Sequence, residues 1–190
     1  MKALRLKPAH ARIVGSAVLA VCAAGGVIVT GACAGTPDPS RVTEIYTPND
    51  AFVQWVGSTT GTGPDLVLGQ RCGTLDCHGQ IGRPLRLFSQ NGLRLVDEAG
   101  AIPGGIPETE DEQFANFTAA ISLQPELTSQ VFAGSLDPHA VLLLLRKPLQ
   151  LERHKGGQVF QPNDPGDVCL TTWLQDNTDY TACKSALQVP

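Results

Sequence analysis

Methionine is almost absent from this chain of 190 residues, because Met1 is the only one. A body without methionine has no thioether side chain to offer a metal ion. Basic residues are also scarce: Lys and Arg number 14 against 18 Asp and Glu, and the formal net charge is −4. An acidic chain repels the phosphates of nucleic acids, which argues against a nucleic-acid-binding role. No internal repeat is visible, so a repeat architecture is not expected.

The first 32 residues are typical of an export signal. Four basic residues lie near the start, and an apolar run extends from Ile13 to Thr30. No twin arginine is present, so we expect export in the unfolded state. The small residues before Cys33 resemble the bacterial lipobox, in which the cysteine becomes the lipidated first residue, although Thr30 departs from the usual Leu. We predict lipidation of Cys33; ordinary cleavage around Ala32-Cys33-Ala34 and a permanent membrane anchor are the alternatives.

Processing at Cys33 sets the organisation of the remaining chain. Residues 33–47 contain Pro and Ser and little to bury, so they are expected to form a tether. Residues 48–190 have the size of one ordinary domain. Removal of residues 1–32 takes away four basic residues and no acidic one, which changes the formal net charge from −4 to −8.

Two cysteines and a histidine lie close together in the pattern C-x4-C-H, formed by Cys72, Cys77 and His78. The related pattern C-x-x-C-H attaches haem covalently. Two thiols form thioethers with the haem vinyl groups, and the adjacent imidazole becomes the proximal iron ligand. The adjacency of Cys77 and His78 meets that requirement, and the longer gap between the cysteines can bulge. We therefore expect a covalent haem c; a local disulfide and a Cys2His2 zinc site with another histidine are the alternatives.

The other cysteines are consistent with this assignment. Without residues 1–32 five cysteines remain, an odd number that needs an explanation in an exported protein. Lipid on Cys33 and haem on Cys72 and Cys77 leave Cys169 and Cys183, which we predict to form a disulfide in an oxidising compartment. Two disulfides and one lipid would also account for all five.

The distribution of apolar residues predicts a mostly α-helical, loop-rich domain. Asp65 is an expected helix cap, Thr109 and Glu112 form a capping box, and Asp137 precedes a proline at the start of a buried helix. Cys183 is expected on a turn after the last helix. Helices are expected at about residues 50–56, 65–71, 109–122, 125–132, 138–145 and 167–175.

Residues 82–95 have apolar residues alternating with arginine on either side of a polar turn, which predicts a short hairpin or an extended loop. Guanidinium groups pair well with carboxylates, so these arginines are candidates to meet haem propionates. The alternative for each of them is an exposed position on a solvated face. The arginines are Arg83, Arg86 and Arg94.

Three further motifs follow in a fixed order: Lys147-Pro148-Leu149, then His154 to Phe160, then Leu170 to Leu174 with Trp173. Together with the C-x4-C-H pattern they resemble predicted c-type cytochrome domains of the exported or lipoprotein type from planctomycetes and myxobacteria. The resemblance covers residues 65–185. It implies a cytochrome c-like fold with one haem. The chain departs from the pattern in its four-residue gap and its lack of a usable methionine.

The sixth iron ligand is predicted by elimination. Methionine commonly fills that position in cytochromes c, and Met1 leaves with the signal. His78 is the proximal ligand, and His139 is expected at the first turn of a buried helix with no motif around it. His154 lies beside Gly156 and Gly157, whose missing side chains allow the backbone to approach a flat ring. We therefore predict His154 as the distal ligand; an exposed loop histidine is the alternative.

These observations predict one-electron transfer through a single bis-histidine haem rather than enzymatic catalysis. The expected location is the periplasmic side of a membrane of the cell envelope, with a lipid anchor or as a soluble periplasmic protein. The expected partners are redox proteins, with the membrane reached through the lipid. Two other functions remain open: an exported lipoprotein stabilised by zinc or a disulfide and without a redox role, and a haem enzyme such as a peroxidase with an open sixth position.

Overall fold

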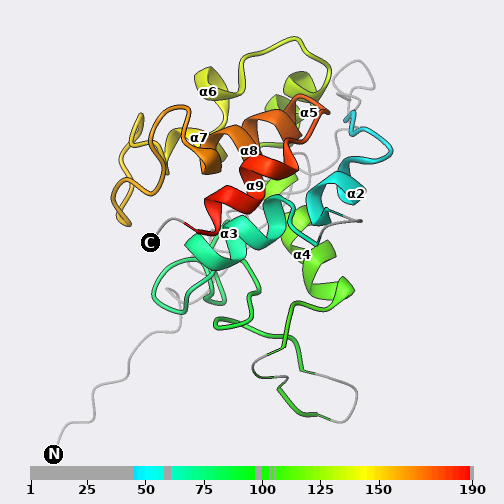
Figure 1. Cartoon of the computed structure of the whole chain (residues 1–190), viewed down its shortest axis with the longest axis vertical. Helices are drawn as coiled ribbons and strands as arrows, with labels where there is room; N and C mark the ends of the chain where they lie inside the picture. The colour runs from blue at the N-terminus through cyan, green and yellow to red at the C-terminus, as the bar shows by residue number, and fades with distance from the viewer. Residues whose placement is uncertain (1–44, 58–60, 97–99, 103, 105, 189–190) are drawn as a thin grey trace, which may run out of the picture. The chain divides into compact units, whose positions relative to one another are not determined.

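The computed structural model describes residues 45–57, 61–96, 100–102, 104 and 106–188 (Figure 1). The predicted signal, the lipidation site Cys33 and nearly all of the predicted tether lie outside these residues. Within the described residues, no helix is long and apolar enough to cross a membrane.

The described residues form a mostly helical, loop-rich domain, which confirms the predicted fold class. One isolated β-bridge joins Phe88 to Leu93, so residues 82–95 form an extended loop with a turn. The helices within the described residues are α2 (Ala51–Val56), α3 (Pro64–Cys72), α4 (Glu110–Ile121), α5 (Pro125–Phe132), α6 (Pro138–Val141), α7 (Leu143–Arg146), α8 (Pro165–Leu174) and α9 (Tyr180–Ala186).

Helix α8 is the centre of the core and packs against α2, α3, α5, α6, α7 and α9 (Figure 1). Its sequence explains this position, because Leu170, Trp173 and Leu174 are almost completely buried. The Trp173 ring lies 4.8 Å from that of Trp55 in α2, measured between ring centres. The Trp173 indole nitrogen also donates a hydrogen bond to the Ala51 carbonyl at 3.0 Å. The two tryptophans therefore connect the first described helix to the last third of the chain.

The disulfide between Cys169 and Cys183 is present, as predicted. It joins α8 to α9, and both cysteines are fully buried. The position of Cys183 differs from the prediction, because it lies within α9 rather than on a turn. Asp179 caps that helix by accepting hydrogen bonds from the backbone nitrogens of Thr181 and Ala182. A cross-link that closes a loop of this length stabilises a fold by about 3 kcal/mol in the chain-entropy model.

Helix α4 begins with the predicted capping box between Thr109 and Glu112. Glu112 has a second role that the sequence did not indicate, because it forms a buried ion pair with Arg94 at 2.8 Å. The Arg94 guanidinium also donates to the carbonyls of Ile106 and Pro107. The alternative of an exposed position is therefore wrong for Arg94, which is buried and fixes the 82–95 loop to α4.

The start of helix α3 lies two residues before the predicted position, because Gly63 rather than Asp65 is its N-cap. Asp65 is buried instead, and it accepts a hydrogen bond from the Asn116 side chain at 2.9 Å. Burial raises the pKa of Asp65 to about 7, although the bond from Asn116 works in the other direction. The carboxyl group is thus part of the core between α3 and α4.

The helix predicted at residues 138–145 is divided at Leu142, whose backbone is extended with φ −88° and ψ 125°. Its two parts are α6 and α7. At the break, the Leu143 backbone nitrogen donates a hydrogen bond to the Gln124 side chain, which lies outside both helices. Leu142 is buried in the core as a result of this extended geometry. The predicted cap Asp137 is confirmed, since it accepts from the His139 nitrogen at 3.0 Å.

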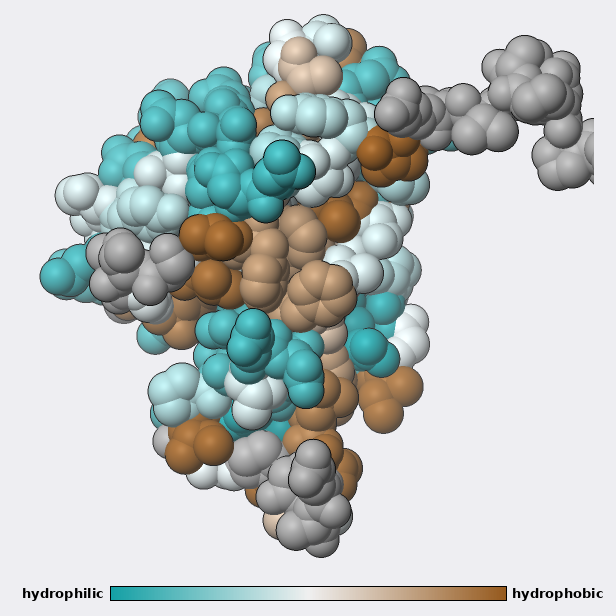
Figure 2. Space-filling model, turned by 90° about the vertical axis from the view of Figure 1, so that its right-hand side faces the viewer, coloured by the Kyte–Doolittle hydropathy of each residue, from teal (hydrophilic) through white to brown (hydrophobic). Residues whose placement is uncertain are grey.

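Apolar residues cross the surface on the side of α2 and α4, between hydrophilic areas (Figure 2). Val53 of α2 and Phe114 of α4 are about half exposed there. The Phe114 ring packs edge-on against Phe52, with ring centres 5.5 Å apart. The neighbouring Phe117 points into the core and lies 6.3 Å from the Trp173 ring.

Candidate haem-binding site

The first part of the candidate site is the end of α3. Cys72 is the last residue of the helix, and the four residues before Cys77 fold into a compact turn. The Cys77 nitrogen donates to the Thr74 carbonyl at 3.0 Å, and the His78 nitrogen donates to the Cys72 carbonyl at 2.9 Å. The wider gap of C-x4-C-H is therefore taken up within the turn, and the backbone of His78 remains beside that of Cys72.

Two glycines allow this turn to close. The position that a Cβ atom would occupy at Gly79 collides with the backbone of Gly73 and Thr74. A Cβ atom at Gly73 would in turn press against the Gly69 carbonyl and the Ser89 side chain. The Ser89 hydroxyl donates to the Gly73 carbonyl at 2.8 Å, which holds the turn against the following loop. The close packing of backbone here explains why glycine follows both Cys72 and His78.

The two thiols are free and differ in their environments. Cys72 is buried, and burial raises the pKa of its thiol to about 12. Cys77 is exposed. A thiol that stays protonated is a poor nucleophile, so Cys72 is chemically protected in the folded chain whereas Cys77 is accessible.

The His78 imidazole is half-buried and is oriented by one hydrogen bond. Its Nδ1 atom lies 2.7 Å from the Leu85 carbonyl oxygen. A carbonyl can only accept, so Nδ1 carries the proton and Nε2 has a free lone pair in the neutral ring. Burial lowers the pKa of His78; the bond to Leu85 works against this, and the positive charges of Arg83 and Lys147 lower it further. Burial and the two positive charges therefore favour the neutral imidazole, which is the form that can bind a metal ion, and only the hydrogen bond to Leu85 opposes this.

His154 lies in the loop after α7 and is oriented in the same way. Its Nδ1 atom lies 2.9 Å from the Gly157 carbonyl oxygen. Gly157 has a φ of +74°, a conformation that glycine adopts without strain, and Gly156 lies against the imidazole edge. The loop is held to the end of α7, because the nitrogens of Val159 and Phe160 both donate to the Pro148 carbonyl.

The structure brings His78 and His154 together from distant parts of the sequence. Their ring centres are 6.1 Å apart and their planes differ by 25°. Neither Nε2 atom makes a hydrogen bond within the described part of the chain. Two imidazoles on opposite sides of one metal ion have ring centres about 6 Å apart, because each metal–nitrogen bond is about 2 Å and the ring centre lies about 1 Å further. The distance between the ring centres is therefore that of two imidazoles that share one iron, whereas the rings themselves are stacked, so the match is in separation and not in the direction of the Nε2 atoms.

Each histidine has the outer partner that metal-bound histidines usually have, a backbone carbonyl on the nitrogen that does not face the metal. The sequence did not indicate these partners, Leu85 and Gly157. Gly157 belongs to the glycine pair that favoured His154 as a ligand, but the pair does not indicate that its carbonyl accepts from Nδ1. Leu85 had none, because it approaches His78 only when the 82–95 loop folds back and the Leu87 nitrogen donates to the His78 carbonyl.

Three large apolar side chains in the two segments that carry the histidines are exposed. Leu75 is 55% exposed, Ile81 is 82% exposed and Leu151 is 53% exposed. Because exposed apolar residues of this size cost solvation free energy, their exposure in these segments suits an apolar ring that would cover them.

The remaining histidine of the domain takes no part in the site. His139 Nε2 lies 2.7 Å from the carboxylate of Asp167 in α8, and the Thr171 hydroxyl lies 3.3 Å from the same nitrogen. These contacts hold α6 to α8. Among the described residues, no group of three or more His, Cys, Asp or Glu side chains gathers in a way that would hold a metal ion. A haem needs only the two imidazoles, since its thioether sulfurs do not bind the iron.

A surface pocket of about 400 Å³ lies elsewhere in the domain, between α5, α6 and the end of α8. Phe132, Leu136, Asp137 and Gln175 are among its lining residues. None of the predicted site residues lines it.

Comparisons of the chain with known protein families, with curated proteins and with solved structures found no match. The functional argument therefore depends on the residues and their geometry.

Proposed function

We propose that this chain is an exported c-type cytochrome that transfers one electron through a single covalently bound haem. The observation that carries the proposal is the pair of His78 and His154, with ring centres 6.1 Å apart and each Nδ1 atom held by a backbone carbonyl. When bound, haem supplies an iron that gains or loses one electron. The chain's part is to attach the ring, provide the axial ligands and set its surroundings.

Cys72 and Cys77 are the proposed attachment residues, and the histidines are the proposed axial ligands. The carbonyls of Leu85 and Gly157 fix both rings in the tautomer with a free Nε2 lone pair. Hydrogen bonds of this kind also make the imidazole a stronger donor to a metal. Two histidines, rather than histidine and methionine, favour a lower reduction potential.

The burial of Cys72 implies an order of events. A buried thiol with a pKa of about 12 does not react readily. Haem attachment at Cys72 is therefore expected before the end of α3 packs against the rest of the domain. Export in the unfolded state, proposed from the N-terminal sequence, provides such a stage on the periplasmic side. Lipidation of Cys33 would then keep the folded domain near the membrane.

Haem attachment is tested by expressing the full chain with a bacterial haem-attachment system. The purified protein should show a Soret band, and the polypeptide should keep its haem stain on a denaturing gel. Cys77→Ser should abolish the stable two-thioether attachment and strongly reduce the stain. Cys33→Ser is the matched control, since it removes the proposed lipid and should leave the stain unchanged. A wild-type protein of apo mass, with both thiols free or paired with each other, would contradict the proposal.

Ligation is tested with His154→Ala. The wild-type ferric haem should be low-spin, and His154→Ala should make it high-spin and open to added imidazole. His139→Ala is the control, because His139 is bonded to Asp167 and lies outside the pair. A low-spin spectrum that is unchanged in His154→Ala would remove His154 from the site.

A further inference from the structure

Charge is strongly segregated in this acidic chain. The segments 71–86 and 146–155, which carry the two histidines, contain seven basic residues and two acidic ones. The other described residues contain two basic and twelve acidic residues. The histidine segments therefore have a formal charge of +5 and the remainder a charge of −10. The seven basic residues are Arg71, Arg83, Arg86, Arg146, Lys147, Arg153 and Lys155.

Most of this positive charge is not used by the fold. Arg83, Arg153 and Lys155 are exposed, and none of them forms an ion pair within the described residues. Arg86 lies over the Phe88 ring, 5.0 Å from its centre, with its charge still exposed. Arg146 is the exception, since it lies 3.5 Å from the Glu152 carboxylate.

These side chains belong to the surface around the histidines. The two segments meet at the histidine pair, whose ring centres are 6.1 Å apart, so their basic residues belong to one region of the surface. Lys147 donates to the Arg153 carbonyl, so the second segment folds back on itself. The exposed apolar side chains of the same segments, Ile81 among them, are those that the proposed haem would cover, which leaves the basic side chains as the exposed part of this surface.

Two haem propionates would neutralise two of these charges and leave a net excess of three, so the surface has more positive charge than a haem requires. The proposed electron transfer needs a redox protein close to the haem, which a lipid surface does not supply, so an acidic protein is the favoured partner.

We propose that Arg83, Arg86, Lys147, Arg153 and Lys155 form a docking surface for an acidic patch on a redox protein that exchanges one electron with the haem. The redox role rests on the proposed function, whereas the charge pattern does not depend on it. One centre loses the electron that the other gains, and no proton or group is transferred. Charges of opposite sign raise the rate of encounter between two proteins, and salt reduces this effect. The interaction is thus fast, weak and specific for acidic surfaces.

The test uses the mature full-length protein and a fluorescently labelled poly-L-glutamate peptide as the acidic probe. Anisotropy should show binding that weakens as salt rises from about 20 mM to about 200 mM, because the screening length shortens over that range. Arg83→Glu combined with Lys155→Glu should weaken binding about tenfold or more at low salt. Lys155→Glu alone should have part of this effect. Lys184→Glu is the matched control, because it makes the same change on an exposed residue of α9 and should leave binding unchanged.

A second arm replaces the peptide with vesicles of phosphatidylglycerol and phosphatidylcholine. Binding to these vesicles through Arg83 and Lys155, without binding to the peptide, would overturn the proposal in favour of an anionic lipid surface. Peptide binding that Lys184→Glu weakens as much as Lys155→Glu would overturn it too, since only net charge would then matter. Haem staining is scored separately. A stained protein without salt-dependent peptide binding contradicts the docking surface alone, and an unstained protein that binds the peptide contradicts the redox role alone.

Discussion

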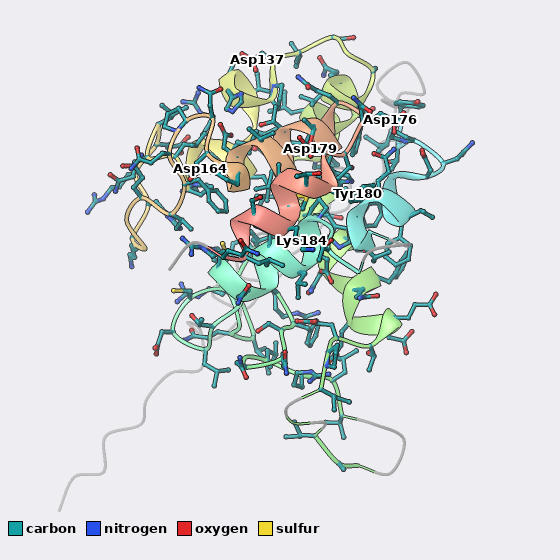
Figure 3. The ribbon with its side chains drawn as sticks, viewed as in Figure 1. Asp137, Asp164, Asp176, Asp179, Tyr180 and Lys184 are labelled. Atoms are coloured by element: carbon teal, nitrogen blue, oxygen red, sulfur yellow. A yellow bond between two sulfur atoms is a disulfide. The ribbon has the colours of Figure 1, made fainter. Side chains whose placement is uncertain are left out.

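Charged residues serve different purposes in the histidine segments and in helices α6, α8 and α9. In the helices the carboxylates are part of the fold, since Asp137, Asp164 and Asp179 are N-caps that accept backbone hydrogen bonds (Figure 3). Asp176 accepts from the Gln54 side chain at 2.7 Å and joins the end of α8 to α2. In the histidine segments, Arg83, Arg153 and Lys155 are exposed and form no ion pair with any other described residue. Acidic residues here stabilise structure, whereas the unpaired basic residues are available for binding.

The largest expected effect on stability is at Glu112, a completely buried carboxylate of α4 that is part of the fold in the same way as the capping aspartates. Glu112→Gln leaves the Arg94 guanidinium in the core without a counter-charge, and breaking a buried pair in this way costs about 3–5 kcal/mol. Urea denaturation should therefore show a much lower free energy of unfolding. Glu110→Gln is the control, because Glu110 is exposed in the same helical turn and its loss should cost less than about 1 kcal/mol. Equal costs for the two variants would show that the ion pair contributes nothing.

Asp65 is a second test of the comparison, because its carboxyl is buried and forms no ion pair with the described residues. Its pKa is raised from 3.8 to about 7 by burial, so the folded state holds the proton more tightly than the unfolded state. The stability from this group is fully present below the unfolded pKa and is lost as the pH rises towards about 7. Asp65→Asn does not titrate. Relative to that variant, the wild-type protein should lose about 3 kcal/mol between about pH 5 and about pH 8.

The measurement is urea denaturation of both proteins at each pH, with Asp111→Asn as the control at an exposed carboxylate of α4. The control should follow the wild-type curve. If Asp65→Asn does so as well, Asp65 is ionised in the folded protein at ordinary pH and its burial has no thermodynamic effect.

A smaller effect is expected at the helix caps. Asp179→Ala removes the acceptor for the backbone nitrogens of Thr181 and Ala182 at the start of α9. Loss of an N-cap side chain costs about 1 kcal/mol. Asp179→Asn keeps an acceptor oxygen without the charge, and it should recover most of that loss in thermal denaturation. If Asp179→Asn is as unstable as Asp179→Ala, charge rather than capping explains the role of this residue.

Local signals in the sequence were sufficient for the short-range parts of the structure. The capping box of Thr109 and Glu112 and the proline-led helix after Asp137 depend on residues within one helical turn, and both are present. The pairing of Cys169 with Cys183 followed from counting thiols. The break at Leu142 could not be predicted, because the Gln124 side chain that bonds Leu143 approaches only when α5 packs beside α6.

The candidate site also has parts that the sequence predicted and parts that it did not. The sequence identified both histidines, and the structure places them together, although their role as iron ligands stays a prediction. The carbonyls of Leu85 and Gly157 that orient the rings were not predicted, since any residue has a carbonyl and only the fold selects one. For Arg94, the sequence pattern predicted an environment that the fold does not provide. Its pattern is the same as that of Arg83 and Arg86, and only the position of Glu112 decides that Arg94 is buried.

The smallest expected effect on stability is at the basic residues of the docking surface. Arg83→Ala and Lys155→Ala remove exposed charges that form no ion pair with the described part of the chain, so each should change the free energy of unfolding by less than about 0.5 kcal/mol. A slight gain in stability would be consistent with this, because like charges around the histidines repel one another.

Arg94→Ala is the contrasting variant. It removes a basic residue that the fold does use and leaves Glu112 buried without its partner, which should cost several times more. All three are compared by urea denaturation at one salt concentration. A loss above about 1 kcal/mol for Arg83→Ala or Lys155→Ala would make that residue part of the fold, and the distinction between structural carboxylates and available basic residues would no longer hold.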